Sequence, residues 1–198
     1  MKKYWLYFKY IIEHKKNVFL ECRKVKGLWW HGIIHDLSKF LPCEFIPYAR
    51  KFYGNYPPNA LLKDIGYKNI RTKESVEEDF QKAWEHHYKN NSHHWNYYNG
   101  EDMDYKDIDK MICDWKAMAR KFGDTAQEFY LKNYKKMNLS WNTRMYIELA
   151  LDLNLSEAHG YGHTMEKFAE MYDKETYDNY FGWIREKYGI DTYEMLKK

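Results

Sequence analysis

Residues 3–24 read KYWLYFKYIIEHKKNVFLECRK, and their hydrophobic spacing is that of an amphipathic helix. One face of this helix carries residues at intervals of four, three and four, namely Tyr7, Ile11, His14 and Val18. His14 is therefore placed on the inward, apolar face. Helical spacing continues along nearly the whole chain, whereas the alternation typical of strands is scarce. The sequence therefore predicts an all-α fold.

The remaining helices are predicted from the same periodicity and from their capping residues. They are expected from Pro42 through Phe52 and over residues 28–40, 72–90, 105–122, 124–137, 141–153, 163–174 and 176–188. Residues 91–104 are polar and are expected to be irregular, and residues 54–66 are expected to form a loop or lid. We expect one domain over 1–137 with a C-terminal helical extension over 138–198, or a single domain over 1–198.

The composition of the 198 residues, 44% hydrophobic and 31% charged, is typical of a globular chain and not of a disordered one. No run of about 18 apolar residues occurs, which excludes a membrane-spanning helix. The N-terminus lacks a signal-peptide pattern, so we expect a cytoplasmic protein. The 32 basic and 29 acidic residues are too balanced to indicate nucleic-acid binding. Three separated cysteines without a CxxC pair argue against a disulfide framework and a thiolate zinc site.

The segment His35-Asp36-Leu37-Ser38-Lys39-Phe40 has the strongest chemical pattern in the chain. An imidazole and a carboxylate at adjacent positions of a helix could both bind one divalent metal ion such as Zn, Fe or Mn. Lys39 lies one helical turn further on and could reach an anionic substrate group held by that ion. These three residues are therefore candidates for a metal site with a neighbouring cation.

Residues 83–95 concentrate four histidines: His86, His87, His93 and His94. His87 shares a helix face with Ala83 and points inward, whereas His86 lies nearer the edge. Because the helix is expected to end near residue 90, its phase does not distinguish His93 from His94 as a ligand. His159 and His163 are read as loop residues, since glycines interrupt any helix there.

Asp114 shares a helix face with Met111 and Met118, which places a carboxylate on an apolar face. A lone buried carboxylate is costly, so Asp114 should be paired, hydrogen-bonded or metal-bound. Taken singly, each candidate also has an ordinary structural explanation. His14 alone could be a hydrogen-bonded core histidine, and Asp114 alone could pair with a buried base. His31 could contact a substrate or simply cover a helix edge.

The order of these residues along the chain resembles that of the HD-domain superfamily, the helical metal-dependent phosphohydrolases, over about residues 3–122. The resemblance implies an HD-domain-like helical bundle. It also implies one metal ion held by His14, His35, Asp36 and Asp114. A second ion would be bridged by Asp36 and held by His87 with His93 or His94.

Two finer resemblances concern short segments. The spacing HDxxK is similar to the dimetal branch of the superfamily, which includes cyclic-dinucleotide phosphodiesterases and mixed-valent diiron oxygenases. The segments HDLSKF, NSHHW and DWKAM are similar to an uncharacterised domain-of-unknown-function family found in bacteria and phages.

The resemblance implies a phosphohydrolase acting on a nucleotide or another small phosphorylated substrate, with one or two divalent ions (Fe, Mn, Zn or Co). Asp36 and Lys39 are the expected catalytic residues. Two alternatives stay open: an HD-type diiron oxygenase, and a non-enzymatic helical interaction protein related to phages or mobile elements. We expect neither a membrane nor a nucleic acid as partner, and the oligomeric state is left open.

Overall fold

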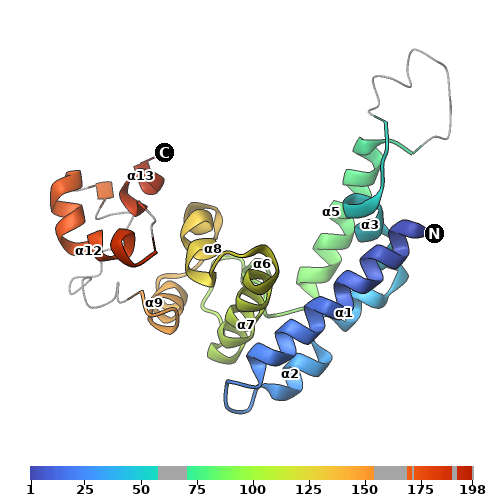
Figure 1. Cartoon of the computed structure of the whole chain (residues 1–198), viewed down its shortest axis with the longest axis horizontal. Helices are drawn as coiled ribbons and strands as arrows, with labels where there is room; N and C mark the ends of the chain where they lie inside the picture. The colour runs from blue at the N-terminus through green and yellow to red at the C-terminus, as the bar shows by residue number, and fades with distance from the viewer. Residues whose placement is uncertain (58–70, 154–168, 171, 189–190, 198) are drawn as a thin grey trace. The chain divides into compact units, whose positions relative to one another are not determined.

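The computed structural model describes residues 1–57, 71–153, 169–170, 172–188 and 191–197. Within these ranges the chain forms helices and no strand, so the predicted all-α class is confirmed (Figure 1). Most of the expected loop over 54–66 and of the expected helix over 163–174 lies outside the described residues, as do His159 and His163. None of the described helices is both long and apolar enough to cross a membrane.

The chain divides into two compact units, Met1–Tyr97 and Tyr98–Lys198. This boundary differs from the expected seam at residue 138. The expected pair of domains, 1–137 and 138–198, stays a prediction. The helices of the first unit are α1 (Lys2–Cys22), α2 (Trp29–Ile34), the 3₁₀ helix η1 (Leu37–Phe40), α3 (Pro42–Tyr53), α5 (Lys73–Lys89) and the start of α6 (Trp95–Tyr98).

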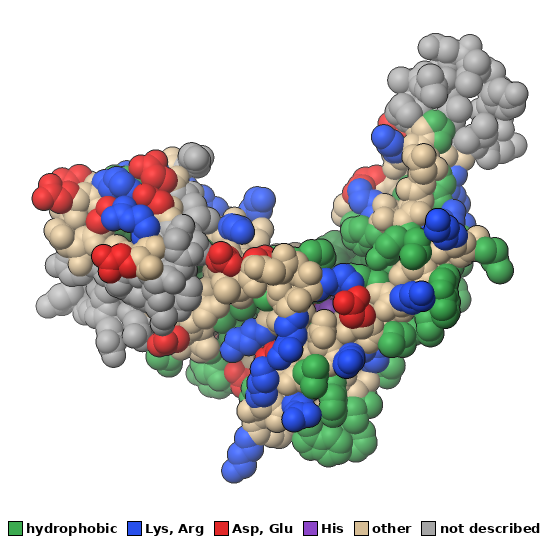
Figure 2. All heavy atoms as spheres, in the orientation of Figure 1, with side chains coloured by type: hydrophobic (Ala, Val, Ile, Leu, Met, Phe, Trp, Pro, Cys, Tyr) green, Lys and Arg blue, Asp and Glu red, His purple; other side chains and the backbone are tan. Residues whose placement is uncertain are grey.

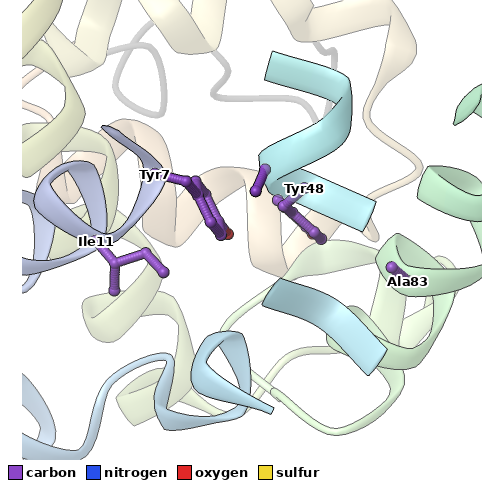
Figure 3. Packing of buried hydrophobic residues seen from close by; sticks show 5 residues of the cluster. Tyr7, Ile11, Tyr48 and Ala83 are labelled. Carbon is purple, nitrogen blue, oxygen red and sulfur yellow. The ribbon is translucent and has the colours of Figure 1, made fainter. Parts of the chain in front are cut away.

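In the first unit α3 packs against both α1 and α5, and α2 packs against α1. The core between them is formed by Tyr7, Ile11, Tyr48, Ala49 and Ala83, all buried. Figure 3 shows residues of this core contributed by α1, α3 and α5. The rings of Tyr7 and Tyr48 are stacked with centroids 5.9 Å apart, which ties α1 to α3. This aromatic core fixes α1, which carries His14, and α5, which carries His87 in its last turn.

The expected helix over residues 28–40 is wrong at its centre. Helix α2 ends at Ile34, His35 has an extended ψ of 130°, and Asp36 adopts the left-handed conformation with φ 54°. Aspartate accepts this conformation more readily than most residues because its short polar side chain can hydrogen-bond locally. Successive side chains of a continuous helix diverge by about 100°. The break between α2 and η1 instead lets His35 and Asp36 enter the same buried space.

Two predicted helix boundaries are set by local chemistry. Helix α5 begins after Thr72, whose hydroxyl accepts a hydrogen bond from the Ser75 amide, while the Ser75 side chain accepts one from the Thr72 amide. Helix α7 ends at Gly123, which has a φ of 80° that glycine adopts without strain. The segment 91–104, expected to be irregular, contains the single turn α6.

The second unit contains α7 (Tyr105–Phe122), α8 (Ala126–Asn133), the 3₁₀ helix η2 (Tyr134–Lys136), α9 (Trp141–Ala150), α12 (Lys174–Tyr188) and α13 (Thr192–Lys197). Helix α7 packs against α8 and α9, and α12 packs against α13. The buried aromatic residues of the second unit include Trp115, Tyr130 and Tyr134. The Tyr130 hydroxyl donates a hydrogen bond of 2.7 Å to the buried Glu148 carboxyl. Burial raises the pKa of Glu148 to about 7.

Candidate metal centre

Six of the predicted metal ligands are buried together in the first unit. They are supplied by α1, by the break after α2, by the last turn of α5 and by the turn that leads into α6. These residues are His14, His35, Asp36, His87, His93 and His94. The sequence left open whether His93 or His94 faces the site, and the structure places both in the cluster.

The two oxygens of the Asp36 carboxylate face different sets of histidines. Oδ2 lies 3.3 Å from His35 Nε2 and 3.7 Å from His14 Nε2. Oδ1 lies 3.3 Å from His93 Nε2 and 3.4 Å from His87 Nε2. Asp36 thus stands between two groups of imidazole nitrogens, with one oxygen directed at each group.

Within each group two imidazole nitrogens approach one another closely. His14 Nε2 lies 3.2 Å from His35 Nε2, and His87 Nε2 lies 3.0 Å from His94 Nε2. A neutral imidazole has one donor and one acceptor nitrogen, so such a pair needs a proton between the two lone pairs or a shared cation beside them. Both pairs point toward an Asp36 oxygen, which is where a cation would be held.

Two buried polar atoms of the cluster have no hydrogen-bond partner in the described part of the chain: Asp36 Oδ1 and His93 Nε2. Such atoms are costly to bury unless something satisfies them. One ligand atom from each of Asp36, His87, His93 and His94 lies within 4.8 Å of the others. A carboxylate with several imidazoles is a donor set suited to Zn, Fe, Mn or Co. The residues present therefore fit a divalent transition-metal ion.

Glu44, at the start of α3, binds the Nδ1 atoms of His86 and His87 and so orients their rings. The sequence did not point to this residue. Its fully buried carboxylate accepts hydrogen bonds from His86 Nδ1 at 2.7 Å and His87 Nδ1 at 2.9 Å, and from Ser38 Oγ at 3.0 Å. Because His87 gives its Nδ1–H to Glu44, its Nε2 is directed at Asp36. An acidic residue in the first turn of a helix is ordinary, so Glu44 carried no sequence signal.

The charged groups of the cluster stabilise one another, which shifts the pKa values of Asp36 and His87. Burial disfavours ionised Asp36, but the positive charges of His35 and Lys39 and the contacts of His14 and His35 hold its pKa well below the usual range. Burial also disfavours protonated His87, yet its contacts with the carboxylates of Asp36 and Glu44 raise its pKa. Asp36 is therefore a carboxylate at neutral pH, as a metal ligand must be.

The break that carries the His-Asp pair is held by two further residues that the sequence did not assign to the site. Lys15 Nζ donates hydrogen bonds to the backbone oxygens of His35 at 2.6 Å and Ile33 at 2.9 Å. His31 Nε2 lies 3.1 Å from His35 Nδ1, so His31 supports a ligand in addition to covering the edge of α2. A histidine ligand whose second nitrogen is bound in this way has a fixed ring orientation.

Residues 3–153 match the model of one protein family, described as a family of unknown function, DUF5662. The chain belongs to DUF5662. The match contains all of the predicted ligands and leaves out the C-terminal helices α12 and α13. No curated protein and no solved structure matches the chain.

Lys39 and Asp114 have different places in this DUF5662 chain. Lys39 is largely buried, and its ammonium forms an ion pair with Asp36 Oδ2. It therefore lies beside the carboxylate and does not project freely toward solvent. Asp114 lies on α7 in the second unit and is half-buried. Its assignment as a metal ligand stays a prediction, as does the catalytic role of Lys39.

Proposed function

We propose that this DUF5662 protein is an HD-type, metal-dependent phosphohydrolase that acts on a nucleotide or another small phosphorylated substrate. The observation that carries the proposal is the Asp36 carboxylate, whose two oxygens face separate histidine groups. A carboxylate so placed can bridge two ions, and paired ions favour in-line displacement at phosphorus because they stabilise both the attacking and the leaving oxygen.

The residues divide into two ligand sets that share Asp36. His14 and His35 would hold one ion with Oδ2, and His87, His93 and His94 would hold the other with Oδ1. When bound, divalent ions supply Lewis-acid charge and make water a nucleophile at neutral pH. In the hydrolysis a water oxygen forms a bond to phosphorus, the P–O ester bond breaks, and the leaving oxygen takes up a proton.

The protein's own side chains would contribute orientation and charge. Glu44 holds His87 in the rotation that directs Nε2 at Asp36. The Lys39 ammonium lies beside Asp36 Oδ2, where its positive charge would stabilise negative charge developing on phosphoryl oxygens. Both residues are fixed by contacts on the protein side, so little reorganisation is needed when a substrate enters.

The test combines metal content with hydrolysis in the full-length chain. We expect about one or two equivalents of transition metal in the native protein. We also expect phosphate release from a panel of nucleotides and hydrolysis of bis(p-nitrophenyl) phosphate. Asp36→Asn should lose the metal and lower hydrolysis at least about a hundredfold. Asp102→Asn, an exposed aspartate whose side chain bonds Asn142, is the matched control and should change neither.

Three results would contradict the proposal. Absence of metal after reconstitution with Mn, Zn, Co or ferrous iron would remove its basis. Iron binding with substrate-dependent oxygen consumption and without phosphate release would favour the diiron oxygenase. A folded protein without metal or either activity would favour the helical interaction protein.

A further inference from the structure

The outer side of the first unit exposes a stripe of large apolar side chains that the metal centre does not use. On α1, Trp5, Phe8 and Ile12 are spaced by three and four residues and lie on one face. All three are exposed, Trp5 to 57% of its surface. A stripe of this kind adds nothing to the internal core, which is built from the neighbouring face with Tyr7 and Ile11.

Helix α2 and η1 extend this stripe sideways. The Phe8 ring lies 6.2 Å from that of Phe40 in η1, and Lys15 on α1 reaches the backbone oxygen of Ile33 on α2. Parts of α2 and η1 therefore border the α1 stripe, and both carry exposed apolar residues. We call the combined surface the α1–α2 face; it comprises Trp5, Phe8, Ile12, Ile33, Ile34 and Leu37. Figure 2 shows hydrophobic side chains gathered where Figure 1 draws α1 and α2.

The same part of the chain is strongly basic. Residues 1–57 contain eleven lysines or arginines and four acidic residues, although the whole chain has a net charge of only +3. Three of those acids, Glu21, Asp36 and Glu44, are buried, so Glu13 is the one exposed acid in this range. The basic excess thus lies in the segment that carries the apolar stripe, and residues 58–198 are net negative. Some of these cations are paired elsewhere, Arg50 with Asp79 and Lys51 with Glu77.

Exposed lysines lie directly beside the apolar residues on α1. Lys9 follows Trp5 by one turn, with its ammonium 5.2 Å from the centre of the Trp5 ring. Lys16 follows Ile12 by one turn, and Lys2 is exposed at the start of the helix. Each ammonium can therefore stay in water or among phosphates while the neighbouring apolar side chain is buried.

We propose that the α1–α2 face binds the surface of an anionic lipid bilayer. Tryptophan and phenylalanine side chains prefer the headgroup region, aliphatic chains enter the acyl boundary, and lysines attract anionic headgroups. A second copy of the chain would bring the exposed lysines of two α1 helices together, which opposes a symmetric dimer through this surface. A nucleic acid would pair with the lysines and stack on tryptophan but would leave Ile12, Ile33 and Ile34 without a role.

This surface mode needs no spanning helix, because an interfacial helix lies in the plane of the membrane. It departs from the expectation of no membrane partner, which rested on the lack of a long apolar run. The inference is independent of the phosphohydrolase proposal, since it uses none of the metal ligands.

The test is sedimentation of the full-length protein with vesicles of phosphatidylcholine alone or mixed with phosphatidylglycerol. We expect binding to the anionic vesicles only, with a blue shift of tryptophan fluorescence and quenching by brominated lipid. The triple substitution Trp5→Ser, Phe8→Ser and Ile12→Ser should abolish the shift and lower binding at least about tenfold. The triple substitution Lys2→Glu, Lys9→Glu and Lys16→Glu should lower binding to the anionic vesicles at least about a hundredfold. The double control Phe122→Ser and Leu149→Ser removes comparably exposed apolar groups elsewhere and should bind as the native chain does.

Several outcomes would overturn the proposal. Failure of the native protein to sediment with anionic vesicles would do so, as would equal binding by the triple variant with an unchanged circular dichroism spectrum. Binding to a single-stranded oligonucleotide without vesicle binding would assign the face to nucleic acid. A native dimer that the triple variant converts to a monomer, again without vesicle binding, would assign it to a second copy.

Discussion

Glu44 shows at the residue scale how a side chain outside the ligand set can control a metal site. Its buried carboxylate is the acceptor for both His86 and His87, and Ser38 donates to it as well. Replacing Glu44 with glutamine keeps the shape of the side chain. It also places an amide NH2 group, itself a donor, next to the N–H and O–H donors of His86, His87 and Ser38. One of the histidine N–H groups then loses a charged acceptor in a buried place, which is costly.

Glu44→Gln is expected to weaken metal binding about tenfold to a hundredfold, because the orientation of His87 is lost while every ligand remains. Isothermal titration of the metal-free protein with Mn²⁺ or Zn²⁺ measures the change. Glu78→Gln, at an exposed position of α5, is the control and should bind as the native chain does. Native-like affinity in Glu44→Gln would show that His87 needs no support from this carboxylate.

Glu44 also makes stability depend on pH. Burial opposes its ionisation, but hydrogen bonds from His87, His86 and Ser38 and the charge of His87 lower its pKa below the usual value of 4.5. A carboxyl whose pKa is lower in the folded state stabilises the fold above pH 4.5 and loses that contribution as the pH falls through the folded value. In the presence of a metal chelator, the difference in the free energy of unfolding between the native chain and Glu44→Gln should therefore shrink below pH 4.5. Urea unfolding at several pH values measures it, and a difference that stays constant would refute the linkage.

At the scale of elements, the close approach of α2 to α1 positions the His-Asp pair. Gly32 on α2 is buried, and a Cβ added there would lie 2.6 Å from the Phe19 Cα on α1. Backbone at that distance cannot move aside as a flexible side chain can, so α2 itself would have to shift. His35 and Asp36 follow directly after α2 and would move with it.

Gly32→Ala is expected to destabilise the protein by about 1–3 kcal/mol through overpacking and to weaken metal binding as well. Gly182→Ala is the matched helical control, because its nearest new contact would be an ordinary 3.7 Å. There the loss of glycine's backbone freedom should leave stability unchanged or raise it by up to about 1 kcal/mol. Chemical denaturation and metal titration of both variants provide the comparison; equal effects would mean that α2 does not depend on close contact with α1.

For the whole molecule, metal binding and folding should be linked. A ligand that binds only the folded state at a hundred times its Kd adds about 2.7 kcal/mol of stability. Calorimetry should therefore show an upward shift of an unfolding transition with Mn²⁺ or Zn²⁺ and a return with chelator. Because Asp36, His87, His93 and His94 all lie in Met1–Tyr97, the transition that includes this unit is the one expected to shift. An equal shift in Asp36→Asn would mean that the ion binds elsewhere.

Short-range patterns in the sequence determined much of this protein. Helical periodicity predicted the all-α class and placed His14 and His87 on inward faces, where both are buried. The cap at Thr72 and the glycine at Gly123 marked true helix ends. These features were predictable because a helix repeats its facing every few residues and its ends need specific local groups.

Long-range packing decided the rest. The left-handed Asp36, the gathering of both His93 and His94 at its carboxylate, and the support from Glu44 all depend on helices that are distant in sequence. A continuous helix over 28–40 satisfied the local pattern, but it would have turned His35 and Asp36 to different sides. Only the packing of α2 and α3 on α1 creates a buried space in which breaking that helix is favourable, since there the carboxylate and the imidazoles satisfy one another.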